Sequence, residues 1–269
     1  MRFAINGATT MPYTLEEDVL AAAGTGFQGV EIWWGKLVRY QEKHSLSELR
    51  ALLSDNALAI TGLCPFLISP FRNTESLRAD FQQALHASGE IGCDLITVCP
   101  DFRPMELSRE EALKRHADAF AWHAEQAAKA GVRLCIEPIA RHTLIPGPME
   151  ALALIKSAGD PENLGVLMDT FHYMCSGISP DTIRAIPLEK LWLVHVNDSE
   201  RGAVEELKDE DRLYPTEGYI DLKGDMDALV SIGYDGYLSV EVFRPAYWRL
   251  PIGEINRRAR ESLDRLLAL

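Results

Sequence analysis

The sequence has few of the features that mark secreted, membrane-spanning or disulfide-rich proteins. Its five cysteines form no CxxC pair and are odd in number, and three lie in apolar, strand-like runs. This pattern is typical of reduced thiols in a cytoplasmic protein, which is the location we expect. No window approaches the roughly 18 apolar residues that a membrane-spanning helix needs, and the N-terminus has no apolar stretch of secretory length.

Positive charge is also scarce. Lys and Arg number 27 against 40 Asp and Glu, which gives a formal net charge of −13. A field of this sign repels duplex nucleic acid and anionic membrane surfaces, so we expect neither as a partner. The obvious basic cluster, at 257–260, alternates with Glu254 and Glu261 in an expected C-terminal helix. We interpret it as a solvated helix face.

What the sequence does contain is a regular alternation of short apolar runs with amphipathic stretches of helical period. The apolar runs cover 2–7, 29–34, 59–66, 94–100, 132–139, 163–170, 191–198 and 237–243. Near-continuous hydrophobicity in such runs favours parallel strands covered by helices. Eight strands alternating with eight helices, at about 30 residues per unit, predict a (β/α)8 barrel.

Local signals support this α/β prediction. Ser45 and Glu48, and likewise Ser108 and Glu111, have the spacing of a capping box that begins a helix, and several helices are expected to stop at a glycine. No linker-like or low-complexity segment divides the chain, so we expect one domain over 1–269. The longest insertion, 200–218, lies between strands seven and eight, where it is placed to form a lid or a substrate wall.

Four consecutive expected strands end on residues that can bind a metal. These are Glu137, Asp169, His195 and Glu241. In a barrel the carboxyl ends of the strands surround one mouth, so the four side chains are expected to converge. A lone strand-terminal acid can equally cap a helix or pair with an arginine, but three carboxylates and an imidazole together repel one another unless a cation joins them. Oxygen-rich donors without sulfur predict one divalent ion: Mn²⁺, Mg²⁺, Co²⁺ or catalytic Zn²⁺.

The segments around these residues are familiar. Glu137-Pro-Ile, Asp169-Thr-Phe-His172, His195-Val-Asn-Asp and Ser239-Val-Glu241-Val-Phe resemble the signature blocks of the xylose-isomerase-like sugar isomerase/epimerase superfamily. The resemblance extends over essentially the whole chain. Within the superfamily, NGATT at 6–10, HSLSELR at 44–50, DEDRLYP at 209–215, GYIDL at 218–222 and VEVFRPAYWRL at 240–250 are similar to the inosose (2-keto-myo-inositol) isomerases.

The resemblance implies a metal-dependent isomerase or epimerase that acts on a keto-cyclitol or a ketose by moving a proton next to a carbonyl. Release of such a proton requires a base within reach and a stabilised enediolate, for which a divalent metal serves as Lewis acid. By resemblance, Glu137 and Glu241 are both metal ligands and the acid/base pair. The implied partner is a small sugar or cyclitol, and the oligomeric state stays open, with a homo-oligomer among the options.

Other residues carry two interpretations each. By resemblance, His172 and Arg201 contact substrate oxygens; the alternatives are a helix cap and an exposed loop arginine. Arg141 is placed either for the pocket or for loop structure, and Trp33 either forms an aromatic wall for a sugar ring or packs in the core. Glu31, inward-facing on the same strand as Trp33 by the period of two, has either a pocket role or a buried ion-pair role.

Four other functions compete with the isomerase. A metal-dependent dehydratase of an inosose or a dehydroshikimate-type acid begins with the same proton abstraction, and an acidic substrate would need a cation such as Arg244 or Arg212. A ketose 3-epimerase is disfavoured because Thr143 stands where those enzymes carry a further glutamate. A DNA-repair endonuclease of this barrel type requires histidines at early strand ends and a basic face, both absent from this sequence. A catalytically silent sugar-binding barrel conflicts with the four retained ligands.

Overall fold

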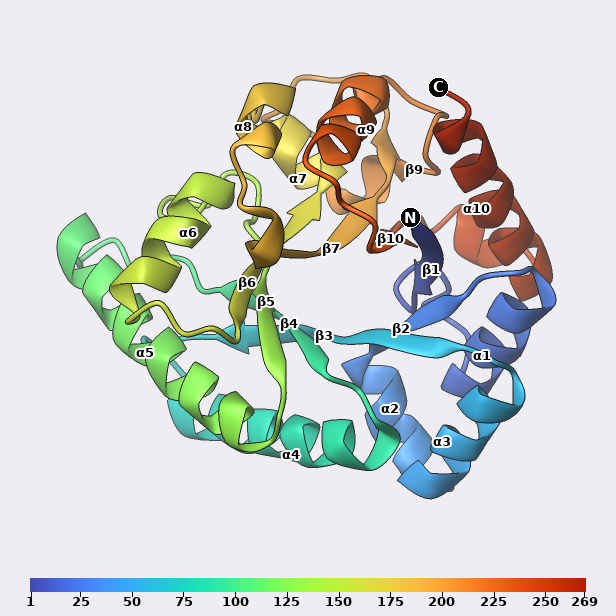
Figure 1. Cartoon of the computed structure of the whole chain (residues 1–269), viewed down its shortest axis with the longest axis horizontal. Helices are drawn as coiled ribbons and strands as arrows, with labels where there is room; N and C mark the ends of the chain where they lie inside the picture. The colour runs from blue at the N-terminus through green and yellow to red at the C-terminus, as the bar shows by residue number, and fades with distance from the viewer.

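Figure 1 shows a ring of strands with helices around its outside. The computed structural model describes residues 1–269. All eight barrel strands are parallel to their neighbours, in the closed order β1-β10-β7-β6-β5-β4-β3-β2. The first and last strands close the barrel, with Ile5 opposite Val240. The predicted (β/α)8 barrel is therefore confirmed.

Each barrel strand overlaps one of the eight apolar runs. The strands are β1 (Arg2–Asn6), β2 (Gly29–Trp33), β3 (Ala59–Ile68), β4 (Leu95–Pro100), β5 (Arg133–Ile136), β6 (Leu164–Asp169), β7 (Leu191–Val196) and β10 (Tyr237–Val240). Two further strands of two residues each, β8 (Asp198–Ser199) and β9 (Arg212–Leu213), pair antiparallel outside the barrel. Residues 200–211, the first part of the long insertion 200–218, lie between the two strands of this small hairpin.

The chain has ten α-helices, so the prediction of eight was wrong. They are α1 (Leu15–Gly24), α2 (Trp34–Gln41), α3 (Leu46–Asp55), α4 (Thr74–Ile91), α5 (Arg109–Lys129), α6 (Pro148–Ser157), α7 (Thr170–Cys175), α8 (Pro180–Arg184), α9 (Leu222–Ser231) and α10 (Ile252–Leu267), with 3₁₀ turns at Leu188–Lys190, Asp209–Asp211 and Tyr247–Arg249. The additional short helices α2 and α7 begin directly at strand ends, where the apolar pattern of the strand conceals them. Each helix is too short or too polar to span a bilayer.

The two expected capping boxes differ. At α3, the Ser45 hydroxyl accepts from the Glu48 amide and the Glu48 carboxylate accepts from the Ser45 amide, which completes the box. At α5, Ser108 accepts from the Glu111 amide, but the Glu111 carboxylate accepts from Arg115 one turn later. The local ion pair has replaced half of the second box, while the helix start is where the sequence predicted it.

The interior of the barrel is layered along the strands. Cys135, Leu167 and Leu193 pack together with Leu95 as a small buried apolar cluster. Because strand side chains alternate with a period of two, the next inward positions on β6 and β7, and just beyond β5, carry Asp169, His195 and Glu137. The apolar layer therefore forms the floor beneath the polar residues at the carboxyl ends of the strands.

Candidate metal centre

Glu137, Asp169, His195 and Glu241 meet at one point in the barrel mouth. Each offers one ligand atom, and these atoms all lie within 4.8 Å of one another. All four side chains are buried. The strand register contributes directly, because Asp169 on β6 lies opposite His195 on β7. The convergence expected from the strand ends is thus present in the structure.

The imidazole of His195 faces two different groups of carboxylates. Its Nε2 lies 2.8 Å from Glu31 Oε2 and 3.0 Å from Glu31 Oε1. Its Nδ1 points the other way, 3.2 Å from Glu241 Oε2 and 3.4 Å from Glu137 Oε1. Nδ1 is buried and has no hydrogen-bond partner. An unpaired buried nitrogen surrounded by carboxylate oxygens is the arrangement that a metal ion satisfies.

Arg212 is the main cation of the cluster. It is 1% exposed, and its Nη1 donates to Asp169 Oδ2 at 2.8 Å and to Glu241 Oε2 at 2.9 Å. Its Nη2 donates to Asp209 within the insertion. One guanidinium among the carboxylates of Glu31, Glu137, Asp169 and Glu241 leaves an excess of buried negative charge. The donor set and its charge therefore fit a divalent cation.

The pKa values of Glu241, His195 and Asp169 are shifted by burial and by the close packing of charged groups in the cluster. Burial raises the pKa of Glu241 to about 7. Burial disfavours a charged imidazole, yet the Glu241 and Glu31 carboxylates raise the pKa of His195 well above its ordinary value. Burial also opposes ionisation of Asp169, but the adjacent Arg212 guanidinium brings the pKa of that carboxyl below its usual value. Burial thus dominates the pKa of Glu241, whereas neighbouring charges outweigh burial at His195 and Asp169.

His172 lies beside the cluster on α7. Its backbone amide donates to Asp169 Oδ1, so Asp169 is both a candidate ligand and the cap of this helix. Its ring Nε2 is 3.1 Å from Arg212 Nη2. Because arginine can only donate, Nε2 accepts, and the ring proton of the neutral imidazole is on Nδ1. That Nδ1 is buried without a partner.

The remaining candidate substrate residues are more dispersed. Arg201 is exposed, and its guanidinium carbon lies 6.0 Å from the Tyr219 ring centroid. Arg141 is also exposed, and its guanidinium donates to the carbonyls of residues 204, 205 and 207, which ties the insertion to the loop after β5. Trp33 is half-buried with its ring edge-on to Phe243, the ring centroids being 5.7 Å apart. Phe243 also contacts the Arg212 guanidinium.

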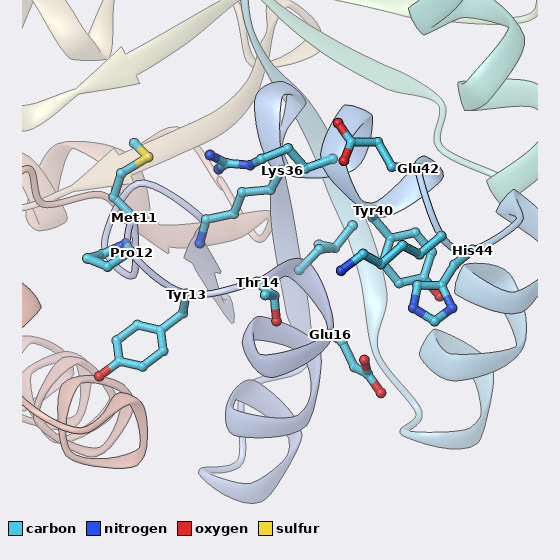
Figure 2. A pocket seen from close by; sticks show the side chains of 12 residues that line it. Met11, Pro12, Tyr13, Thr14, Glu16, Lys36, Tyr40, Glu42 and His44 are labelled. Atoms are coloured by element: carbon cyan, nitrogen blue, oxygen red, sulfur yellow. The ribbon is translucent and has the colours of Figure 1, made fainter.

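A cavity of about 530 Å³ lies between the loop after β1 and helix α2 (Figure 2). It is lined by residues 11–16 and by side chains of α2 and the following turn, including Tyr40 and His44, whose rings stack 4.6 Å apart. Lys36 borders it, but its ammonium pairs with Asp18 at 2.6 Å inside the protein. None of the four candidate ligands lines this cavity, so cavity size does not identify the chemical site in this chain.

Comparison with known proteins decides the family. The family described as xylose isomerase-like TIM barrel matches residues 19–269. The chain belongs to this family.

Two curated relatives illustrate the activities present among similar proteins. An inosose isomerase from Bacillus velezensis is 26% identical, covering 100% of this chain and 98% of the relative. A 3-dehydroshikimate dehydratase from Pseudomonas putida is 30% identical, covering 95% of this chain but only 40% of the relative. Among solved structures, the IOLI protein with a bound zinc atom superposes with a TM-score of 0.91 at 24% identity, over 100% of this chain and 98% of that one.

Two residues of this xylose isomerase-like barrel, Arg212 and Glu31, contact candidate ligands although the sequence did not indicate these contacts. From the sequence, Arg212 was considered only as a cation that could bind an acidic substrate, yet its guanidinium contacts two candidate ligands. Glu31 was expected to face inward, but its contact with His195 was not foreseen. The inward position of Glu31 on its strand could have predicted a contact with a residue inside the barrel. For Arg212 the signal was weak, because its placement depends on the pairing of β8 with β9.

Proposed function

We propose that this chain is a divalent-metal-dependent isomerase of a keto-cyclitol, with an inosose as the first substrate to test. The proposal rests mainly on one observation: three buried carboxylates surround an imidazole Nδ1 that has no hydrogen-bond partner. The family match and the inosose isomerase relatives support the reaction class and the choice of substrate.

Glu137, Asp169, His195 and Glu241 would hold the metal. When bound, a divalent ion supplies a Lewis acid that polarises a carbonyl oxygen, a contribution of several kcal/mol to stabilising developing negative charge. The zinc atom in the solved structure of the IOLI protein is consistent with an ion in this type of barrel.

The proton transfer is assigned to the glutamates. Glu137 follows β5 and Glu241 follows β10, so they approach the cluster from different sides of the barrel. One carboxylate takes the proton from the hydroxyl-bearing carbon next to the substrate carbonyl. The other, in its protonated form, gives a proton to the former carbonyl carbon, and the hydroxyl proton passes to the former carbonyl oxygen. Arg212 holds Glu241 at Oε2 and Cys99 lies 3.6 Å from Glu137 Oε2, so both carboxylates are oriented by neighbours.

His172 is assigned to substrate binding. Its ring proton on Nδ1 has no acceptor within the protein, so a substrate oxygen would satisfy a buried donor. The ring is held at its other nitrogen by Arg212 and at its backbone by Asp169. This double attachment fixes the donor before a substrate arrives, which favours recognition of a polyol hydroxyl or carbonyl.

A dehydratase is the second candidate, favoured by the 3-dehydroshikimate dehydratase relatives. An acidic substrate of that type needs a cation for its carboxylate. Arg212 is already paired with Asp169, Glu241 and Asp209, and Arg244 is paired with Glu200. The two arginines considered for that carboxylate are therefore already engaged, whereas an uncharged cyclitol requires no such cation, which favours the isomerase over the dehydratase.

The decisive experiment follows scyllo-inosose by NMR in D₂O with metal-loaded protein. We expect deuterium to enter at the carbon next to the carbonyl and an isomeric ketone to form. Treatment with EDTA should abolish both, and Glu137→Gln or Glu241→Gln should slow them by about 10² to 10⁴.

Two other outcomes contradict the isomerase. Deuterium exchange accompanied by a dehydrated enone or diketone would assign the dehydratase instead. Absence of exchange with Mn²⁺, Mg²⁺, Co²⁺ or Zn²⁺ would remove the inosose assignment. Glu110→Gln, on the exposed first turn of α5, is the matched control and should leave exchange unchanged.

A further inference from the structure

Glu31 is a buried carboxylate with no Arg or Lys partner. The residue is 1% exposed, and its hydrogen-bond donors are His195 Nε2, Ser239 Oγ at 2.9 Å and Thr97 Oγ1 at 3.3 Å. Its register neighbours on the adjacent strands are Asn6 and Gly62, which carry no charge. Burying a carboxylate is unfavourable unless it is well paired, and an apolar side chain would fill the same space without that penalty.

The contact between Glu31 and His195 crosses the interior of the barrel. Glu31 is on β2 and His195 is on β7, three strands away around the ring by way of β1 and β10. Figure 1 shows the two strands on opposite parts of the ring. Apolar residues form the floor below His195, and the Ser239 hydroxyl donates to Glu31. Together they leave the Glu31 carboxylate directed at one nitrogen of the His195 ring.

This contact determines which ring nitrogen is free. Because both Glu31 oxygens lie within 3.0 Å of Nε2, that nitrogen carries a proton and donates. The lone pair of Nδ1 is then directed at Glu137, Asp169 and Glu241, whose nearest oxygens lie 3.4, 3.8 and 3.2 Å away. A carboxylate at the remote nitrogen of a metal-binding histidine fixes the ring and makes the other nitrogen a stronger ligand.

We propose that Glu31 is a positioning residue that orients His195 so that Nδ1 is the atom that binds the metal. The inference rests on the metal centre of the proposed function, and it assigns the second partner of that histidine. Ser239 and Thr97 hold Glu31 in place, so the hydrogen-bonded chain runs from two hydroxyls through Glu31 to His195. The metal affinity of this barrel therefore depends on a residue that does not touch the metal.

The first test compares metal affinity in Glu31→Gln and in the wild-type protein. The substitution keeps the size of the side chain and an acceptor for Nε2, but removes the negative charge. We expect Zn²⁺ and Mn²⁺ to bind about 10 to 100 times more weakly, measured by competition with a chromogenic chelator in the absence of substrate. Asp225→Asn, which neutralises another buried carboxyl on α9, is the matched control and should leave the affinity unchanged.

A second test uses wild-type protein and so does not depend on folding of the variant. In metal-loaded protein labelled with ¹⁵N-histidine, long-range ¹H–¹⁵N spectra identify the protonated nitrogen of His195. We expect a proton on Nε2 and metal at Nδ1. A proton on Nδ1 with metal at Nε2 overturns the proposal, and so does an unchanged metal affinity in folded Glu31→Gln protein.

These outcomes separate this inference from the choice of substrate. If inosose is not converted but Glu31→Gln weakens metal binding, the positioning role stands and the isomerase assignment fails. If the wild-type protein binds none of the divalent ions, the positioning role and the metal centre both fail. A purely structural role for Glu31 would instead lower the free energy of unfolding without changing the affinity for metal.

Discussion

The guanidinium of Arg212 donates to Asp169 across 2.8 Å, although the two residues are 43 positions apart in the chain. Both are buried, and the same Nη1 also donates to Glu241. The arginine thus compensates carboxylates that the proposed metal would also compensate. Its contribution is open to measurement in metal-free protein.

We expect Arg212→Met to lower the free energy of unfolding of chelator-treated protein by about 3 to 5 kcal/mol, because the substitution leaves buried carboxylates without their partner. Urea denaturation measures the difference. Arg201→Met is the control: Arg201 is exposed and outside the cluster, so its replacement should change stability by no more than about 0.5 kcal/mol. Equal effects of the two substitutions would show that Arg212 does not compensate the cluster.

Metal should stabilise the protein through its candidate ligands. At a free metal concentration 100 times the dissociation constant, linkage adds about 2.7 kcal/mol to the free energy of unfolding, and the melting temperature rises accordingly. We expect His195→Gln to lose most of this increment in thermal unfolding. His123→Gln, at another buried histidine whose Nδ1 bonds to a helix carbonyl, should retain it. A full increment in the His195 variant would argue against the site.

Asp225 predicts a pH dependence away from the metal centre. Burial, with a further contribution from Asp221, raises the pKa of Asp225 to about 7. Because this pKa lies above the unfolded value of about 3.9, the protonated carboxyl is favoured in the folded state. Its contribution to stability is therefore complete below about pH 4 and is lost as pH rises through about 7.

Asp225→Asn mimics the protonated carboxyl and should remove this dependence. We expect the stability of the variant relative to wild type to increase by up to about 1.4 kcal/mol per pH unit between pH 4 and 7. Urea denaturation at several pH values gives the difference. Parallel curves for the two proteins would mean that Asp225 does not titrate in this range.

Arg141 should restrain the insertion 200–218, because its guanidinium donates to three carbonyls within 204–207. We expect Arg141→Ala to accelerate proteolysis in this segment, measured by limited digestion and mass spectrometry. Arg201→Ala removes an exposed arginine that lies near the Tyr219 ring and bonds to none of these carbonyls, so it should leave the cleavage rate unchanged. An unchanged rate in Arg141→Ala, together with a raised KM for substrate, would favour the substrate contact instead.

The sequence predicted the barrel and the convergence of the four candidate ligands, because both follow from local patterns. A strand that ends in a carboxylate is visible in a few residues, as in Val166 to Asp169, and a parallel barrel brings all such ends to one mouth. The extra helix α7 was missed because its six residues, Thr170–Cys175, follow the strand directly and are too few to show a helical period. Periodicity over six residues does not distinguish a short buried helix from the end of a strand.

The residues that contact the candidate ligands were harder to predict from the sequence. Glu31 and His195 meet across the barrel at a separation of 164 residues, and Arg212 enters through a hairpin whose strands have two residues each. No local pattern encodes either contact, because both depend on the closed barrel and on one loop conformation. Proximity to His195 in the sequence favoured Arg201 as a site residue. In the fold, however, Arg201 is exposed and Arg212 is the buried arginine of the cluster.

Closure of the barrel by β1 and β10 has a consequence for biosynthesis. The cluster draws its groups from positions 31 to 241, and Glu241 follows the last strand to be made. During translation the acidic side chains of β2, β5 and β6 emerge long before Glu241, so the nascent chain has no complete ligand set. A metal held by these groups would therefore be captured only at the end of synthesis, after nearly the whole polypeptide has left the ribosome.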